Sequence, residues 1–287
     1  MIAIERILFP TDLSQQSLKT LPFVKSMACR FHAEVSLLHV LESPLSMYSP
    51  AEAMAWANLV NIDEIRETRR SAFERFGAQE LEGVSVRREF AEGDPAAEIN
   101  YYVRKNNIHL IMMPTRGYGT FRSLLIGSVT AKVLHDAHCP VWTGVHTEET
   151  QSVNACRRIL CAVDADFRDV PVIIWANDFG KLTGAEVQLF HAVPELEAGR
   201  HPSDAERRES LLNAAHRELE EMQNEASVKL AAVIRGGRPD WSVRNQAEDV
   251  HADLIIIGRG EMQKPFGRLR SAAYSIIRSA PCPVISV

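Results

Sequence analysis

The residues best placed to do chemistry lie in one stretch, from Pro114 to Thr130. It follows an apolar run that ends at Met113, and it contains Gly117 and the pair Gly127-Ser128 ahead of a segment with helical spacing. A strand, a glycine-containing loop and a helix that begins at Gly-Ser bring backbone N–H groups together, and the helix dipole there also favours negative charge. The stretch therefore predicts a phosphate site.

Two strand ends in the first half of the chain are expected to face the same site. Asp12 follows the apolar run at 6–9, and Val40 ends the next apolar run. Ligands of open α/β sheets bind outside the carboxyl ends of the strands, so one crevice can hold Asp12, Val40 and the loop after Pro114. Asp12 would otherwise cap the next helix, although Ser14 is available for that role.

The loop shows no catalytic pattern. It lacks the lysine of a Walker-type Gly-Lys-Ser/Thr, and no general base is placed beside it. Arg116 is either a phosphate clamp or a solvated loop residue, and the sequence leaves both readings open. We therefore predict a binding site rather than an enzyme.

Histidines and cysteines form no pattern of their own. His39 and His191 end matching strands and are expected to be satisfied by backbone groups, because no second ligand stands at metal spacing. His135 and His138 lie one helical turn apart without an acidic or cysteine partner, so no metal site is predicted. The five cysteines include no Cys-x-x-Cys pair and are expected to be reduced thiols, with those before Pro-Val buried: Cys29, Cys139, Cys156, Cys161 and Cys282.

Composition describes a globular protein with room for two domains. The 287 residues are 46% hydrophobic and 24% charged, and the net charge of −5 is small, with both signs interspersed. A basic stripe is absent, which argues against nucleic acid as the main partner. The sequence has no signal-peptide pattern and no apolar run of about 18 residues, so we expect a cytoplasmic protein without membrane association.

Apolar runs and turn signals predict strands that alternate with helices in the first half of the chain. A helix after Ser14 should be kinked or delayed by Pro22, one long surface helix should run from Ala51 to Phe76, and Asp94-Pro95 should begin another. The strands are expected at 6–9, 34–40, 84–90, 108–113 and 140–145.

The same pattern begins again after a polar stretch from Thr147 to Asn154. The strand that ends at Asp164 copies the one that ends at Asp12 at an offset of 152 residues, whereas Cys282 copies Cys139 at an offset of 143. The second copy is therefore nine residues shorter, and the period far exceeds the roughly 20 to 50 residues of a solenoid. We predict a first domain over residues 1–146, a linker over 147–155 and a second domain over 156–287.

Strands and helices at this spacing specify α/β domains. Each copy is expected to hold a five-stranded, parallel, doubly wound, Rossmann-like sheet with right-handed crossovers. The last strand, at 283–287, leaves an open edge that invites a partner strand. Its copy at 140–145 lies in the same molecule, so we expect the two domains to pair through these strands as an internal pseudo-dimer.

The order of these motifs resembles the universal stress protein family. The likeness covers nearly the whole chain as two tandem copies, and it is weaker in the second. It implies a parallel α/β domain that often pairs through its last strand, with an ATP site in some members. The residues that carry it in the first copy are Pro10-Thr11-Asp12, Leu37-Leu38-His39-Val40, Gly93-Asp94-Pro95-Ala96, Thr115-Arg116-Gly117, the run from Leu124 to Thr130, and Cys139-Pro140-Val141.

ATP-binding members of that family carry Gly-x2-Gly-x9-Gly-Ser/Thr. Here Gly117, nine further residues and Gly127-Ser128 match its second half, while Pro114 replaces the first glycine. Proline has no N–H to donate and carries a ring where the backbone would approach the ligand. The resemblance implies phosphate contacts from Gly117, Gly127, Ser128 and Val129, ribose or adenine contacts from Thr11 and Asp12, and an adenine contact from Val40; Pro10, Met113, Thr115, Arg116 and Thr130 complete the predicted pocket.

The second copy departs further from the motif. Its loop begins at Gly258, but the spacing to Ser271 is one residue too short and Arg270 replaces the glycine before it. Glu261 also brings negative charge toward a place meant for phosphate. We expect Asp164 to keep its position without a nucleotide, and Arg270 is a candidate to fill the phosphate site.

These features together predict a cytoplasmic, ATP-binding sensor of the stress response. The nucleotide, with or without Mg²⁺, would bind the first domain and act as a switch for an unidentified protein partner. Slow ATP hydrolysis and a homodimer are compatible with this reading. The alternative is a nucleotide-free scaffold in which Pro114 closes the site. An adenylating enzyme or an electron-transfer flavoprotein would need a different loop early in the chain.

Overall fold

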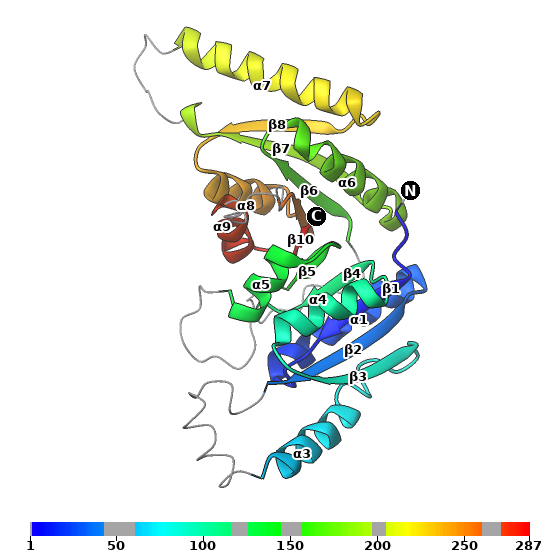
Figure 1. Cartoon of the computed structure of the whole chain (residues 1–287). Coiled ribbons are helices and arrows are strands. Elements are labelled where there is room, and N and C mark those ends of the chain that lie inside the picture. Colours follow the sequence, from blue (N-terminus) through cyan, green and yellow to red (C-terminus); the bar gives the residue numbers. More distant parts are fainter. Residues whose placement is uncertain (1, 43–60, 116–125, 145–155, 197–204, 260–270) are drawn as a thin grey trace, which may run out of the picture. The chain divides into compact units, whose positions relative to one another are not determined.

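The computed structural model describes residues 2–42, 61–115, 126–144, 156–196, 205–259 and 271–287 (Figure 1). Contacts between residues divide these into two compact units. The N-terminal unit holds the described residues from Ile4 to Thr115 and from Gly127 to Cys139, and the C-terminal unit holds those from Pro140 onward.

The N-terminal unit is built on parallel strands in the order β3-β2-β1-β4. Helices α4 and α5 lie side by side, and α3 lies beyond the outer strand β3 (Figure 1). The elements are β1 (Arg6–Pro10), α1 (Gln15–Phe31), β2 (Glu34–Leu41), α3 (Ile62–Arg75), β3 (Val86–Glu92), α4 (Pro95–Lys105), β4 (Leu110–Met113) and α5 (Ser128–Asp136).

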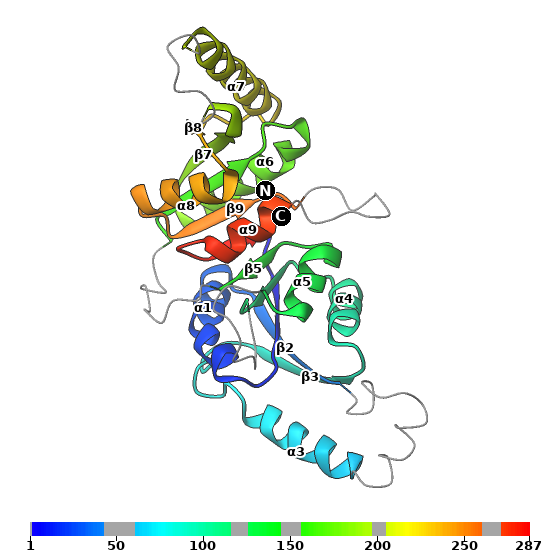
Figure 2. The ribbon, with the colours of Figure 1, turned by 90° about the vertical axis from the view of Figure 1, so that its left-hand side faces the viewer.

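The C-terminal unit has strands in the order β5-β10-β9-β6-β7-β8. Helices α8 and α9 lie side by side in both views (Figures 1 and 2). The elements are β5 (Val141–Thr143), β6 (Arg158–Val163), α6 (Val170–Thr183), β7 (Glu186–Val193), α7 (Ala205–Glu225), β8 (Ala231–Gly236), α8 (Pro239–Asp249), β9 (Leu254–Ile257), α9 (Ser271–Ser279) and β10 (Val284–Ser286), with 3₁₀ turns at Phe167–Asp169 and Pro194–Leu196.

The central strands carry the core of each unit. Strands β1 and β4 of the N-terminal unit are almost entirely buried, as are β6 and β9 of the C-terminal unit. Strands inside a parallel sheet are covered by helices on both faces, which is why their sequences are continuous apolar runs. The outer strands β3 and β8 are only half-buried and mix apolar with charged residues. The expected parallel α/β architecture is confirmed.

The predicted pairing of the last strands is also confirmed. Strand β5, from the first sequence copy, pairs antiparallel with β10, so that Trp142 stands opposite Ile285. Thr143 Oγ1 donates to the Val284 carbonyl at 3.1 Å, and Ser286 Oγ donates to the Val141 carbonyl at 3.4 Å. Two strands of three residues each are thereby joined inside one compact unit.

The predicted N-cap Ser14 is confirmed: helix α1 begins at Gln15 and continues through Pro22 to Phe31, so the later start that Pro22 left open is wrong. The predicted long helix from Ala51 to Phe76 is interrupted at Asn61. Helix α3 begins only at Ile62, where the Asn61 side chain accepts from the Glu64 N–H as an N-cap. Residues 51–60 of the predicted long helix lie outside the described residues.

The predicted start of α4 is confirmed. The Asp94 side chain accepts from the Ala97 N–H at 2.8 Å, and Pro95 occupies the first turn. Among the described residues, no helix is both long and apolar enough to cross a membrane.

Replacing Trp142 by alanine should destabilise the protein far more than the same change at Trp241. Trp142 is 2% exposed in the β5–β10 pair, whereas Trp241 is 57% exposed on α8. We expect Trp142→Ala to lower the free energy of unfolding by about 3–5 kcal/mol and Trp241→Ala by about 0.5 kcal/mol or less, measured by urea denaturation. Equal losses would show that the β5–β10 pair does not stabilise the folded chain.

Candidate functional site

The candidate site of the N-terminal unit begins where β1 ends. The Thr11 N–H donates to the Leu38 carbonyl at 2.9 Å, and the Thr11 carbonyl lies 2.7 Å from His39 Nδ1. Thr11 is thereby tied on both sides to β2, the strand that also carries the half-buried Val40. The predicted residues at the ends of β1 and β2 therefore do lie together.

Asp12 organises the turn into α1. Its Oδ1 accepts from the Ser14 N–H at 3.0 Å and from Ser17 Oγ at 2.8 Å. Between them Leu13 has a left-handed backbone, with φ of 66°, and its N–H donates to Thr11 Oγ1 at 3.0 Å. Asp12 thus braces the helix start, while Ser14 is the N-cap itself. The structure therefore shows the helix-start role of Asp12, and its contact with a nucleotide stays a prediction.

The N-terminus of α5 forms the opposite side of the candidate site. Gly127 is its N-cap, with φ of −61° and ψ of 150°, and as a glycine it has no side chain to make the capping hydrogen bond. The backbone there is open to any residue, so glycine is not required by conformation; its value is the close approach that it allows. Ser128 is exposed and Val129 half-buried. Anions bind at such helix N-termini.

Two hydrogen bonds hold the start of α5 beside β4. The Gly127 N–H donates to the Thr115 carbonyl at 2.9 Å, and Thr130 Oγ1 donates to the Pro114 carbonyl at 3.3 Å. Pro114 and Thr115 are buried directly after β4. The candidate residues Thr115, Gly127 and Thr130 are therefore brought together. Arg116 and Gly117 lie outside the described residues.

The C-terminal unit repeats the backbone of this site. Ala165 has φ of 52° where Leu13 has 66°, and His191 Nδ1 lies 2.9 Å from the Val163 carbonyl as His39 does from Thr11. Sequence duplication has thus preserved the turn after the first strand. Asp164 keeps the position of Asp12 and is exposed.

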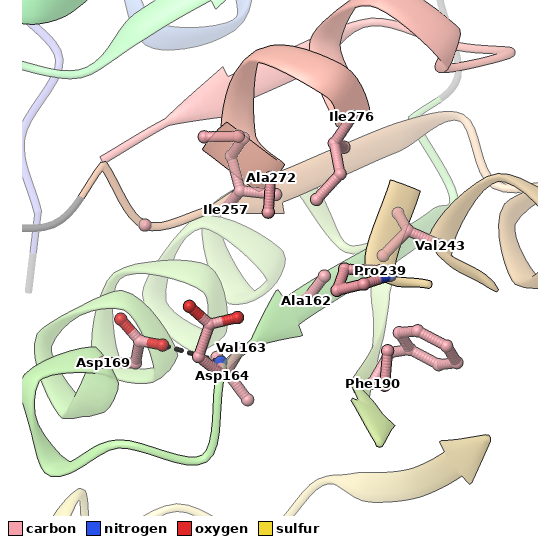
Figure 3. Close-up of a pocket in the computed structure, with 13 residues that line it drawn as sticks. Ala162, Val163, Asp164, Asp169, Phe190, Pro239, Val243, Ile257, Ala272 and Ile276 are labelled. Carbon is pink, nitrogen blue, oxygen red and sulfur yellow. Dashed lines mark hydrogen bonds between the residues drawn. The ribbon is translucent and has the colours of Figure 1, made fainter. Parts of the chain in front are cut away.

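The side chains at the second copy differ in charge. A small pocket, with a cavity volume of about 30 Å³, lies between the ends of β6, β7 and β9 and helix α9 (Figure 3). Asp169 is only 2% exposed, and its Oδ2 accepts from the Asp164 N–H at 2.8 Å. The pocket is lined by Ala162, Val163, Asp164, Asp169, Phe190, Ala192, Pro239, Val243, Ile257, Gly258, Ala272, Ala273 and Ile276.

Asp169 places a buried carboxylate beside Gly258, at the point where the loop begins. A Cβ placed on Gly258 would lie 2.9 Å from Asp169 Oδ1, so the carboxylate already packs against this glycine. Like charge would repel a phosphate group there. The observation agrees with an unused second site, although the predicted role of Arg270 lies outside the described residues. Sequence reasoning missed Asp169; an offset of 152 pairs it with Ser17, a polar position one turn into the helix of the first copy.

Metal ligation and reactive thiols find no support in the described part of the chain. No group of three His, Cys, Asp or Glu side chains lies there close enough to hold a metal ion. All five cysteines are free, with Cys139 and Cys282 buried as expected. Burial raises the pKa of the Cys161 and Cys282 thiols far above the usual range, with a smaller contribution from the nearby acids Asp169 and Asp253. Both thiols therefore stay protonated.

The comparisons with known proteins identify one family. A model described as the universal stress protein family matches residues 3–143 and again 155–287. Universal stress protein MJ0531 of Methanocaldococcus jannaschii is 33% identical over 138 residues, which cover 48% of this chain and 79% of that protein. Universal stress protein YxiE of Bacillus subtilis is 30% identical over 141 residues, 47% of this chain and 95% of that protein.

Among the similar solved structures, some cover both copies and others cover about half of this chain. The crystal structure of a universal stress protein from Archaeoglobus fulgidus covers 99% of this chain and 96% of its own, with 25% identity and a TM-score of 0.69. A universal stress protein solved in complex with cAMP covers 51% of this chain with 19% identity and a TM-score of 0.35. So distant a likeness places no ligand on this chain.

The contact between Gly258 and Asp169 can be tested by a double-mutant cycle. Gly258→Ala should lower the free energy of unfolding by about 1–3 kcal/mol, because the new methyl group overlaps the Asp169 carboxylate. In an Asp169→Ala background the same change should cost clearly less, with a coupling of about 0.5 kcal/mol or more. Urea denaturation of the four proteins measures the cycle. The same cost in both backgrounds would mean that Asp169 does not pack on this glycine.

Proposed function

Because this chain belongs to the universal stress protein family, we propose that it is a stress-response regulator that binds ATP in its N-terminal unit. The observation that carries the proposal is the start of α5, where the N-cap is Gly127, a residue with no side chain to make the capping bond. The first N–H groups of a helix need partners from outside the helix, and phosphate oxygens are good ones.

Each part of the nucleotide has candidate contacts in this unit. The N–H groups of Ser128 and Val129, in the first turn of α5, would bind phosphate together with the predicted loop residue Gly117. Thr11 and Asp12 would face the ribose, and the half-buried Val40 would pack on adenine. These side chains all follow carboxyl ends of parallel strands or the helix next to them, where such folds bind nucleotides. Mg²⁺ would accompany the phosphates, with Asp12 as its nearest carboxylate partner.

The side chains of the second copy support the proposal that each chain binds only one nucleotide, in its N-terminal unit. The turn after its first strand keeps the backbone of the first copy, but its pocket contains the buried carboxylate of Asp169 beside Gly258. A nucleotide that binds one of two similar sites can shift the conformation of the whole chain if it prefers one arrangement. We therefore propose a regulatory switch, with weak hydrolysis at most, that acts in the cytoplasm through a protein partner.

The proposed first domain extends slightly beyond the matched family region 3–143, and the second begins one residue inside the matched region 155–287. We propose a nucleotide-binding domain over residues 1–146, a linker over 147–155 and a degenerate domain over 156–287. A homodimer of such chains is compatible with this division.

A nucleotide-free scaffold is the second candidate function, and Pro114 is the observation that favours it. Pro114 replaces the first glycine of the ATP motif and is buried after β4, where it offers no N–H to a ligand. Its carbonyl is already bonded to Thr130. In this reading the two copies serve only to bind partners.

Placing an acid at Gly127 should separate the two candidates. The backbone of Gly127 accepts any residue, and aspartate is a good N-cap, so Gly127→Asp should fold normally while its carboxylate takes the N–H groups meant for phosphate. We expect wild-type protein to bind one ATP per chain in calorimetry with Mg²⁺, and Gly127→Asp to bind at least about tenfold more weakly, a loss of about 1.4 kcal/mol.

The matched control is Arg238→Asp at the N-cap of α8. The N-cap residue of that helix also makes no side-chain capping bond, with φ of −62° and ψ of 135°, but the helix belongs to the C-terminal unit. Its affinity for ATP should equal that of the wild type. If the wild type shows neither heat with millimolar ATP nor co-purified adenine nucleotide, the switch is wrong and the scaffold remains.

A further inference from the structure

His39 is a buried histidine with one nitrogen that has no partner. Its side chain is enclosed on β2 and only 6% of the residue is exposed. Nδ1 lies 2.7 Å from the Thr11 carbonyl, whereas Nε2 is fully buried and makes no hydrogen bond with any described residue. Because a carbonyl only accepts, Nδ1 must carry the proton, and Nε2 is left with its lone pair.

Aromatic rings surround the unpartnered side of this imidazole. The Phe73 ring of α3 lies 5.8 Å from the His39 ring between centroids, and the Phe90 ring of β3 lies 5.5 Å from it. Phe73 and Phe90 are 6.3 Å apart, so the three rings form one cluster. A neutral imidazole suits such a cluster, but a proton on Nε2 would be a buried donor without an acceptor.

The charges around the cluster are mostly positive. Arg69 and Arg70 come from α3, and the Arg70 guanidinium lies 4.7 Å from the centre of the Phe90 ring. Arg88 of β3 lies 5.6 Å from the Phe73 ring centre. The negative groups are Asp12 at the end of β1, which favours protonation of His39, and Glu74 of α3, which interacts with Arg88.

The pKa of His39 is lowered, chiefly by burial and also by the positive charge of Arg69. The hydrogen bond with the Thr11 carbonyl and the negative charge of Asp12 oppose this shift. The charged form of the ring is therefore disfavoured where it lies. Burial likewise lowers the pKa of the Arg88 guanidinium, with Glu74 opposing. A second cation at His39 would add to the charge already confined beside α3.

Helix α3 depends on this cluster for its place on the sheet. Phe73 is its only fully buried residue. Arg88 donates to the carbonyls of Phe73 and Phe76 at 2.8 and 2.7 Å, which ties the end of the helix to β3. The ion pair of Arg66 with Glu92 is solvent-exposed and contributes little. A helix with so few buried contacts belongs to the part of a protein that opens most easily.

We propose that protonation of His39 releases helix α3 from the sheet. With a neutral ring, Phe73 stays packed against His39 and Phe90 and holds the helix beside β3. With a protonated ring, the cation and its unpaired N–H leave the cluster for water, and α3 comes away with Phe73. This device does not require that the N-terminal unit binds ATP.

The direction of the effect follows from the two states of His39. Its pKa is about 6.5 when exposed and lower when buried, so the released state takes up the proton first as the pH falls. Docking is therefore complete above pH 6.5 and weakens below it, until the pH passes the lowered value. Because one proton is involved, the ratio of released to docked α3 rises by at most about tenfold per pH unit.

His191 supplies a matched control within the same chain. It occupies the equivalent strand position and lies 2.9 Å from the equivalent carbonyl, that of Val163. It is half-buried rather than enclosed, however. Its ring already reaches the solvent and is not enclosed by a helix, so replacing it should not change how a helix docks.

Hydrogen exchange over α3 tests the release. The opening of residues 62–75 would be followed by mass spectrometry between about pH 7.5 and about pH 5, with the chemical exchange rate corrected at each pH. The wild type and His191→Asn should show α3 opening more as the pH falls below about 6.5. His39→Asn, whose amide can still donate to Thr11, and His39→Phe, which keeps a ring, should show no such dependence.

A second measurement on the wild type guards against a variant that fails to fold. Ring-proton NMR should show His39 titrating with the same midpoint as the exchange of the α3 amides. The proposal is overturned if α3 opening is independent of pH in the wild type, if both His39 variants keep the wild-type dependence, or if His39 titrates without any change in α3. These outcomes are scored without nucleotide, and ATP affinity is measured separately at pH 7.5 or above, so the release and the ATP site can fail independently.

Discussion

The turn that follows the first strand of each copy is the constraint on which the rest of this molecule depends. A histidine of the neighbouring strand meets the carbonyl at the turn, and a left-handed residue two positions later directs the chain into the next helix. Leu13 and Ala165 both accept this backbone, although neither is a glycine. The strain is small and is offset by hydrogen bonds to the same turn. This arrangement puts Asp12 and Asp164 at the mouths of their sheets.

The same backbone supports opposite chemistry in the two copies. In the first, Ser17 lies in the first turn of α1 and donates to Asp12. The residue 152 positions later is Asp169, the N-cap of α6, which accepts from the Asp164 N–H and packs against Gly258. A hydroxyl in the first copy thus corresponds to a buried carboxylate in the second, which would repel a phosphate group near Gly258. Function in a duplicated fold is thus decided by single side chains on a conserved scaffold.

Much of the fold could be predicted from the sequence because the signals were local. Apolar runs predicted the central strands, and Asp94-Pro95 predicted the start of α4. The matching last strands of the two copies predicted the β5–β10 pair. A local signal for the late start of α3 also exists, because Asn61 is followed three residues later by Glu64. The helical spacing of the residues before Asn61 favoured an earlier start. Pro22 left a later start of α1 open in the sequence. Burial of the residues on either side of it outweighs the lost backbone hydrogen bond, and only the tertiary packing shows that burial.

The candidate site was harder to predict than the fold. Asp12 and Gly127 stand where the motif puts them, yet nothing local distinguishes Asp169 from any surface acid. His39 is a similar case: its backbone bond followed from its position at a strand end, but its unpartnered nitrogen depends on Phe73, which is 34 residues away in sequence. Burial and charge at such positions are properties of the assembled unit.

Thr11 connects the proposed nucleotide site with the helix α3. Its carbonyl receives the His39 ring, and its side chain and N–H shape the turn that presents Asp12. A change that frees His39 removes one hydrogen bond from Thr11, an effect of about 1 kcal/mol, or about fivefold in an equilibrium constant. Coupling between two equilibria is reciprocal. Any ligand that binds more tightly when this turn is intact must therefore shift the equilibrium toward neutral His39 and docked α3 by the same factor. The coupling needs no path beyond one shared residue, because the His39 ring and the turn that presents Asp12 both make hydrogen bonds with Thr11.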